Sequence, residues 1–383
     1  MSVLAAMLGW ISFGLAVMAV VYTAMAGLFL QRFFGAVGRA MDGQDDQAGA
    51  TILKPLHGAE PGLKAHLEGY FVQDQTAPLQ IVFAARVSDD PALLIAREVA
   101  LRQPHVETVF VANATLHGEN RKISNLINGM AAARHPVIIV SDSDIGVAPD
   151  YLRRVRAALA APGVGVVTCP YYGEARAGFW SKIAAMGLSY QFLPNVIAGV
   201  SLGAAKPCMG STIALTRETL ERIGGFEAFS DTLADDYAIG AAVRDLGLSS
   251  VVAPVLVAHG CADKSFGEMF AHELRWAKTV KGVDPIGHLG SIFTHALPLS
   301  LISVILLRGS PASLWLLAAA FLARLWLMST VDHAVGRPLG SWWLTPMRDI
   351  VSLLVFAGSF FVRSVEWRGA KFHVTGSGDL KPQ

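Results

Sequence analysis

The sequence predicts an α/β protein in which a doubly wound, mostly parallel sheet is combined with apolar helices at both ends of the chain. Three observations support this class. Strand-like and helix-like segments alternate from Thr51 onwards, as in a parallel sheet with crossover helices. The run Val137–Val140 contains only β-branched residues, which is typical of a strand buried on both faces. The chain is also 53% hydrophobic and 16% charged, too apolar for an ordinary soluble protein.

The predicted elements of the sheet domain follow from apolar runs bounded by polar residues and prolines. Pro91 suits the first turn of a helix, because a proline there sacrifices no hydrogen bond. The expected strands are 51–53, 79–85, 108–111, 137–140 and 163–168, and the expected helices are 63–72, 91–100 and 217–223.

Two carboxylates follow the buried strand where it ends. Asp142 and Asp144 are separated by one residue, so both can turn toward one hard cation. Open α/β sheets bind their ligands at the carboxyl ends of the strands. Oxygen ligands of this kind suit Mg²⁺ or Mn²⁺ bound together with substrate phosphates. The sequence therefore predicts a metal–diphosphate site; the alternative for a lone Asp-x-Asp is a solvated turn.

Other carboxylates stand at comparable positions. Asp90 follows the strand predicted over 79–85, and the pair Asp235 and Asp236 opens an apolar helix. An aspartate in the first turn of a helix is also explained by capping and by the helix dipole. The pair is therefore a candidate for chemistry and a candidate for helix capping.

The amino-terminal segment is predicted to be a membrane anchor. Residues 1–31 contain no charged side chain and are followed by Arg32 and Arg39, which favours a cytoplasmic location for the next domain. A cleavable signal peptide is the alternative, but it would have a basic start and a shorter apolar run. Residues 32–50 are predicted to be a linker.

The region 51–282 is predicted to be the sheet domain. Within it, 183–205 lacks charged residues but is interrupted by Pro194 and several glycines. If this segment crossed the membrane, the carboxylates before and after it would lie on opposite sides. We therefore expect one or two helices that lie in the membrane interface.

The carboxyl-terminal region is predicted to hold further membrane helices over 283–365. Two spans are expected, 289–307 and 314–330, joined by a short turn. A third apolar run, 350–362, is short for a crossing, and we expect it to be interfacial or partly inserted. Residues 366–383 form a tail.

Net charge and cysteine spacing exclude several classes. The formal net charge is +1, so no basic excess indicates a nucleic-acid partner. Cys169, Cys208 and Cys261 are too widely spaced for a disulfide framework or a zinc site.

The order of the motifs carries more information than any one of them. The chain has Lys54 and Pro55 in Lys-Pro-Leu-x-Gly, then Asp-Asp-Pro-Ala, Gly-x-Asn-x-Lys-x-x-Asn-Leu, Asp-Ser-Asp, an acidic pair before Tyr, and Arg-Trp. This order resembles the ceramide glucosyltransferase family, glycosyltransferase family 21, over nearly the whole chain, and especially its bacterial branch that includes hopanoid-biosynthesis glycosyltransferases. The resemblance implies a GT-A catalytic domain and a substrate-binding role for the Lys-Pro pair.

The resemblance also implies roles for the carboxylates. Asp90 matches the family's first aspartate, near the nucleotide base. Asp142 matches the second, which engages the metal and the diphosphate, and Asp144 completes the Asp-x-Asp. Asp236 matches the third, the implied catalytic base, with Asp235 beside it. The implied cofactor is Mg²⁺ or Mn²⁺.

Further matched residues are expected to contact substrate. Lys122 and Asn125 are implied to contact diphosphate or ribose; ordinary polar residues of a loop and a helix start are the alternative. Arg275 and Trp276 match the end of the (Gln/Arg)-x-x-Arg-Trp motif, and His272 departs from its first position. These three side chains fall on one face of a helix, which on its own would indicate an amphipathic surface helix.

The expected function is transfer of a hexose, glucose in the wider family, from a UDP-sugar to the hydroxyl of a membrane lipid such as ceramide, with inversion at the anomeric carbon. The expected location is the bacterial inner membrane, with the catalytic domain in the cytoplasm. The alternatives are N-acetylglucosamine transfer to a polyhydroxylated hopanoid, a polyprenyl phosphate acceptor, a processive polysaccharide synthase, a catalytically inactive scaffold that binds sugar nucleotides, and a transporter with intramembrane charges.

Overall fold

A computed structural model describes residues 3–37, 48–74, 77–361, 365–367, 370–374 and 380–382. The chain divides into two compact units, each described here by itself. The sheet unit comprises Gly35–Arg176 and Leu202–Ala262. The helical unit comprises Met1–Phe34, Ala177–Ser201 and Asp263–Gln383.

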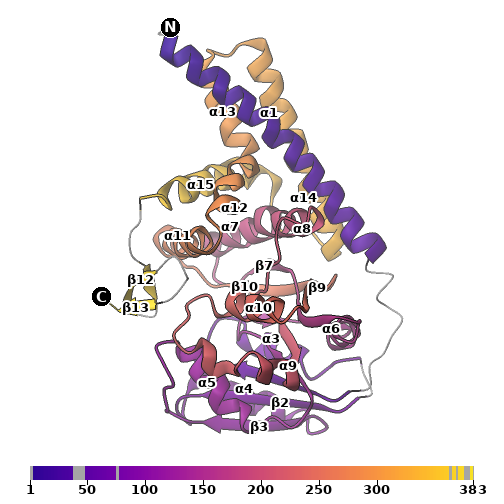
Figure 1. Cartoon of the computed structure of the whole chain (residues 1–383). Coiled ribbons are helices and arrows are strands. Elements are labelled where there is room, and N and C mark those ends of the chain that lie inside the picture. The colour runs from indigo at the N-terminus through magenta and orange to yellow at the C-terminus, as the bar shows by residue number, and fades with distance from the viewer. Residues whose placement is uncertain are drawn as a thin grey trace. The chain divides into compact units, whose positions relative to one another are not determined.

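The sheet unit, in which Figure 1 labels β2, β3 and β9, is built on seven strands in the order β3-β2-β1-β4-β8-β6-β9. β8 runs antiparallel to both β4 and β6, and the other pairs are parallel. The prediction of a mostly parallel sheet is therefore confirmed. The strands are β1 (Ala50–Pro55), β2 (Leu79–Ala85), β3 (Glu107–Ala112), β4 (Val137–Val140), β6 (Val164–Thr168), β8 (Ile213–Thr216) and β9 (Ser249–Val252).

Helices cover both faces of this sheet, so it is doubly wound as predicted. Successive residues of β4 alternate between two cores: Ile139 packs with the helices of one face, and Ile138 and Val140 pack with those of the other. The first face carries α3 (Leu63–Gly69), α4 (Pro91–Leu101) and α6 (Tyr151–Leu159), and the second carries α5 (Arg121–Met130), α9 (Arg217–Arg222), the 3₁₀ turn η3 (Phe226–Phe229) and α10 (Asp235–Asp245).

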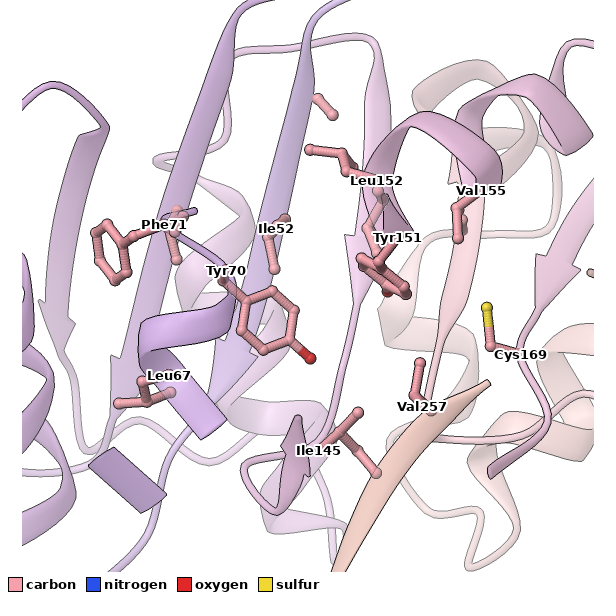
Figure 2. Packing of buried hydrophobic residues seen from close by; sticks show 14 of the residues in the cluster. Ile52, Leu67, Tyr70, Phe71, Ile145, Tyr151, Leu152, Val155, Cys169 and Val257 are labelled. Atoms are coloured by element: carbon pink, nitrogen blue, oxygen red, sulfur yellow. The ribbon is translucent and has the colours of Figure 1, made fainter. Parts of the chain in front are cut away.

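A second, three-stranded sheet has the order β5-β10-β7, with β5 (Ile145–Gly146), β7 (Tyr171–Ala175) and β10 (Val257–Cys261). Its residues Ile145 and Val257 join the first core, where the rings of Tyr70 and Tyr151 meet edge to face at 6.0 Å (Figure 2). This packing fixes the chain that leaves β4.

The helical unit contains three helices long and apolar enough to cross a membrane, among the residues that the structure describes: Leu4–Gly35, Phe179–Ser201 and Pro311–Val335. The second runs from α7 through a π-helical turn into α8. The elements are α1 (Val3–Arg32), η1 (Phe33–Val37), α7 (Phe179–Gly187), η2 (Leu188–Phe192), α8 (Leu193–Ser201), α11 (Phe266–Val283), α12 (Pro285–Gly290), η4 (Ser291–Thr294), α13 (Ala296–Leu306), α14 (Pro311–Val335), η5 (Trp342–Leu344) and α15 (Thr345–Gly358), with short antiparallel strands β11 (Val365–Trp367), β12 (Ala370–Val374) and β13 (Leu380–Pro382).

One predicted span of this unit contains a bend. The span expected over 289–307 is not one straight helix, since Pro285–Thr294 and Ala296–Leu306 are bent by 64°. His295 is non-helical there, with φ −101 and ψ 48. Pro298 explains the break, because its ring would clash with the carbonyl four residues earlier in a continuous helix.

The apolar helix predicted over 183–205 begins earlier, at Phe179, and ends at Ser201. The short run 350–362 lies largely in α15, which ends at Gly358. Most of the predicted linker, residues 38–47, and part of the tail lie outside the described residues.

Candidate active site

The site forms where β4 ends and its two aspartates begin. The backbone N–H of Asp142 donates to the carbonyl of Gly210 at 3.3 Å, and the Nζ of Lys54 donates to the carbonyl of Asp142 at 2.5 Å. Lys54 is fully buried on β1 and lies over the Tyr70 ring. Burial lowers the pKa of Lys54 to about 7, although Asp142 acts in the opposite direction. The loop after β4 is thus held from both sides.

Core side chains reinforce this loop. The Tyr70 hydroxyl lies 2.5 Å from the Ser141 hydroxyl, which in turn donates to the carbonyl of Ser211 at 2.9 Å. The Tyr151 hydroxyl lies 2.9 Å from that of Thr212. The apolar core therefore ends in hydroxyls that fix the backbone around the two aspartates.

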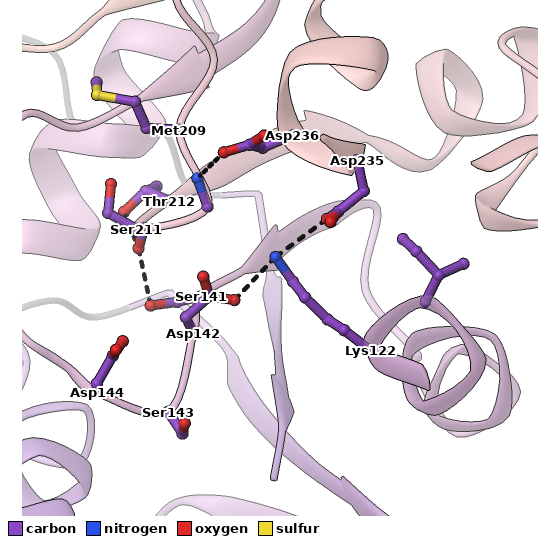
Figure 3. A network of polar contacts seen from close by, with 12 residues as sticks. Lys122, Ser141, Asp142, Ser143, Asp144, Met209, Ser211, Thr212, Asp235 and Asp236 are labelled. Carbon is purple, nitrogen blue, oxygen red and sulfur yellow. Dashed lines mark hydrogen bonds and ion pairs between the residues drawn. The ribbon is translucent and has the colours of Figure 1, made fainter. Parts of the chain in front are cut away.

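Lys122 joins two of the predicted site carboxylates (Figure 3). Its Nζ lies 2.9 Å from Oδ1 of Asp142 and 3.0 Å from Oδ2 of Asp235. Burial opposes the charged form of Lys122, but the surrounding carboxylates outweigh it and raise the pKa of Lys122 above its usual range. Burial also raises the pKa of Asp142, against the influence of Lys122. One ammonium group thus stabilises an excess of negative charge.

The two aspartates of the acidic pair, Asp235 and Asp236, differ in burial and in hydrogen bonding. Asp235 is buried, and it also accepts from the side-chain amide of Asn120 at 3.3 Å. Asp236 is partly exposed, and its Oδ2 accepts from the N–H of Gly210 at 2.9 Å. Burial and the neighbouring Asp235 raise the pKa of Asp236 to about 6. Asp235 is committed to the ion pair, whereas Asp236 is available for proton transfer near neutral pH.

Asp144 lies beside β10. Its Oδ2 is 3.4 Å from Nε2 of His259, and its buried Oδ1 has no hydrogen-bond partner among the described residues. The preceding Ser143 donates to Glu60 at 2.9 Å. A buried carboxylate oxygen without a hydrogen bond is suited to coordinate a cation.

The donor set suits a metal that is shared with a substrate. In the described part of the chain, no group of three or more His, Cys, Asp or Glu side chains is placed to hold a metal ion. Mg²⁺ needs only one or two carboxylates when phosphates and water complete its coordination. Asp142 and Asp144 meet that requirement.

Other predicted site residues hold the loop after β1 from neighbouring elements. Asp90 caps α4 and is buried; its Oδ1 accepts from the N–H groups of Gly58 and Ala92, both at 2.9 Å. The side-chain amide of Asn125 donates to the carbonyl of Leu56 at 3.3 Å. Pro55 ends β1 just before this loop. These residues shape the loop through the hydrogen bonds to Gly58 and Leu56.

The predicted Arg-Trp motif lies on α11 of the helical unit. The rings of His272 and Trp276 are 4.3 Å apart, as expected for one helix face. Nδ1 of His272 lies 3.3 Å from Asp263. Between the motif positions, Glu273 forms two hydrogen bonds to Arg348, at 2.7 and 2.9 Å. Arg275 lies on the same helix.

Sequence reasoning missed three contributors to the cluster. Asn120 caps α5, accepting from the N–H groups of Lys122 and Ile123, and an Asn just before a helix is a recognisable signal. Gly210 contacts both aspartate loops through its backbone, and a Cβ there would lie 2.6 Å from Oδ2 of Asp142. His259 stands in an apolar strand. The sequence around Gly210 and His259 contains no local pattern that indicates these contacts.

The chain is similar to known glycosyltransferases. It is 24% identical over 231 residues to ceramide glucosyltransferase 1 of Caenorhabditis elegans, covering 60% of this chain and 49% of that protein. It is 23% identical over 345 residues to ceramide glucosyltransferase 3 of the same organism, covering 87% of this chain and 74% of that one. The chain thus spans about half the length of the first of these relatives.

A solved structure is also similar, the mannosyltransferase PcManGT from Pyrobaculum calidifontis in complex with GDP-Man and Mn²⁺. Its TM-score is 0.48 and its identity 21%, covering 91% of this chain and 99% of that chain. The family model for glycosyl transferase family 21 matches residues 11–380, which is nearly the whole sequence. This match confirms the resemblance drawn from the motif order, and the chain belongs to glycosyltransferase family 21.

Proposed function

We propose that this protein is a membrane-bound, inverting hexosyltransferase that moves a sugar, glucose in the first instance, from a UDP-sugar to the hydroxyl of a ceramide-type lipid. The observation that carries the proposal is the convergence of Asp142 and Asp235 on Lys122, with Asp236 tied to the same loop through Gly210. Carboxylates from separate parts of the chain thereby share one polar centre, as donor binding and proton transfer require.

The chemistry assigns different work to these side chains. Asp142 and Asp144 would hold Mg²⁺ or Mn²⁺, which supplies charge neutralisation for a departing diphosphate. Asp236 accepts the proton of the acceptor hydroxyl, assistance that typically contributes about 10²–10⁴-fold. Lys122 keeps Asp142 and Asp235 in place. Attack from the face opposite the nucleotide would invert the anomeric carbon.

A lipid acceptor explains the apolar helices. Each CH₂ group moved from bilayer to water costs about 0.8 kcal/mol, so an enzyme gains by meeting its acceptor at the membrane. Three helices of sufficient length and apolar character support membrane insertion. Arg32 at the end of α1 favours a cytoplasmic location for the sheet unit. The proposed location of the whole protein is the bacterial inner membrane.

The test is a transfer assay with the purified full chain in lipid nanodiscs. Labelled UDP-glucose, UDP-N-acetylglucosamine and GDP-mannose are each combined with ceramide, a polyhydroxylated hopanoid or a polyprenyl phosphate, and the labelled lipid is identified by mass spectrometry. We expect labelled ceramide from UDP-glucose. Labelled hopanoid from UDP-N-acetylglucosamine would replace the proposed substrates, a labelled polymer would indicate a synthase, and no labelled product would contradict the proposal.

Asp236→Asn tests the assigned base. We expect UDP release to fall by about 10²–10⁴-fold, the usual size of general-base assistance. Asp245→Asn, the same change at the exposed end of the same helix, is the matched control and should leave the rate unchanged. Equal rates for Asp236→Asn and wild type would remove Asp236 from this role.

A further inference from the structure

Helix α11 carries a stripe of side chains that changes from apolar to basic where α15 ends. Phe270 and Leu274 lie beside Gly358, the last residue of α15, since a Cβ built at Gly358 would lie 3.9 and 3.4 Å from their side chains. Lys278 and Lys281 continue the same stripe, because residues three and four positions apart share a helix face. Two ammonium groups therefore lie on one face of α11, at the point where its packing partner stops.

Neither ammonium group has an anionic partner. Nζ of Lys278 is buried and has no hydrogen bond to any residue that the structure describes. Burial and the neighbouring Lys281 lower the pKa of Lys278, as expected for a charge without a partner. Nζ of Lys281 donates to the carbonyl of Ser359 at 3.4 Å and lies 4.5 Å from the centre of the Phe360 ring. An anion at this face would stabilise both charges.

The nearby carboxylates make other contacts. Both oxygens of Glu273 accept from Arg348, at 2.7 and 2.9 Å. Oδ1 of Asp284 accepts from the N–H of Gly287 at 2.8 Å and so caps α12. In the part of the chain that the structure describes, no carboxylate forms an ion pair with either lysine. The positive charge on this face of α11 is therefore left for a partner from outside.

The same elements leave apolar side chains exposed. His288 joins α12 to the residues after α15, because its Nε2 lies 2.8 Å from the Ser359 hydroxyl and its ring lies 5.4 Å from that of Phe360. Basic and exposed apolar groups together are typical of a surface that lies in the membrane interface. The large exposed apolar side chains are Val280 on α11, Ile286 and Leu289 on α12, and Phe360 and Phe361 after α15.

We infer that Lys278 and Lys281 bind the phosphate group of an anionic membrane phospholipid. A soluble anion would use the two charges alone, whereas a phospholipid also places its acyl chains against the exposed apolar side chains. The stem of Lys278 is half-exposed, so its rotation brings Nζ to a phosphate at the surface, as lysines at a membrane interface commonly do. The inference goes beyond the proposed function, because this lipid is neither the sugar donor nor the acceptor.

The test measures phospholipid binding to the full chain in detergent micelles by native mass spectrometry. Dioleoylphosphatidylglycerol is compared with dioleoylphosphatidylcholine, which has the same acyl chains but no net charge. We expect tighter binding of phosphatidylglycerol. Equal binding of the two lipids overturns the inference. Displacement of phosphatidylglycerol by UDP or by inorganic phosphate also overturns it, because the lysines would then serve a soluble anion.

Two variants locate the binding site. Lys278→Gln and Lys281→Gln each remove one positive charge, and we expect each to weaken phosphatidylglycerol binding by roughly 5-fold, the usual contribution of one basic residue near anionic lipid. Lys264→Gln, the same change at an exposed lysine before α11, is the matched control and should bind as the wild type does. Lys281→Gln keeps the test decisive if thermal unfolding shows that Lys278→Gln is not folded. Unchanged binding by a folded Lys281→Gln protein would contradict the inference.

The binding measurement does not depend on the proposed reaction, since it contains neither a sugar nucleotide nor a lipid acceptor. Hexose transfer by a chain that does not distinguish the two phospholipids would overturn only this inference. Selective binding of phosphatidylglycerol by a chain that transfers no sugar would overturn only the proposed function.

Discussion

The two units treat buried charge in opposite ways. In the described part of the helical unit, the two buried arginines each face one carboxylate in a bidentate pair, Arg324 with Asp349 and Arg348 with Glu273. In the sheet unit a single ammonium, that of Lys122, lies between Asp142 and Asp235, and Asp236 adds further negative charge. Balanced pairs serve to orient helices, whereas an unbalanced cluster leaves charge available for a cation or a proton. The comparison predicts that the two kinds of site respond differently to the same substitution.

Among the changes that test this comparison, the largest effect is expected from Lys122→Met. This change leaves Asp142 and Asp235 without their shared partner, and the loss of one preorganised charge typically costs about 10²–10³-fold in rate. The double variant Lys122→Met with Asp235→Leu removes one of the two unpaired carboxylates, so stability should recover in part while activity does not. Thermal unfolding and UDP release measure the two quantities. Recovery of activity in the double variant would refute the assigned role of the cluster.

A smaller effect, on stability rather than on rate, is expected from Arg348→Met. Glu273 would remain largely buried without a partner, which typically costs about 3–5 kcal/mol. Combining Arg348→Met with Glu273→Leu should restore most of this loss, because a well-packed apolar pair is often as stable as a buried ion pair. Denaturant unfolding is the measurement. A double variant no more stable than the single one would show that the pair is more than a structural contact.

The smallest effect is a shift in the pH profile. Asp236 must be ionised to accept a proton, and its pKa is raised to about 6, so kcat should fall as pH drops through about 6. Asp235→Asn removes a negative neighbour and frees Lys122, and both changes favour the ionised form. The acidic limb should therefore move to lower pH. A limb that stays in place or moves upward would contradict the coupling between the two carboxylates.

The sequence predicted those parts of the fold that depend on local patterns. The strands β2 and β4 coincide with the predicted runs 79–85 and 137–140, because each is an apolar stretch with polar residues or proline beside it. Neither the strand β8 nor its antiparallel direction was predicted, and the direction of a strand depends on the connection that leads to it and not on composition. The break at His295 also escaped prediction, because hydropathy does not register the clash that Pro298 introduces.

The candidate site shows the same limit. Its carboxylates could be named from motifs, yet their pairing could not, because Lys122 and Asp235 are far apart along the chain and meet only through packing of α5 and α10 against one sheet face. Asp90 was expected near a nucleotide base, a role that stays a prediction. Its cap bond to Ala92 suits an aspartate just before Pro91, but no motif indicated its hydrogen bond to Gly58.

Gly210 links the Asp142 loop to Asp236 through its own backbone groups. Its carbonyl accepts from the N–H of Asp142, and its N–H donates to the carboxylate of Asp236. In the proposed reaction, a displacement of the segment that would hold the diphosphate is therefore passed through Gly210 to the proposed base, Asp236. The proposed donor site and the proposed base are thus linked by a residue that has no side chain of its own.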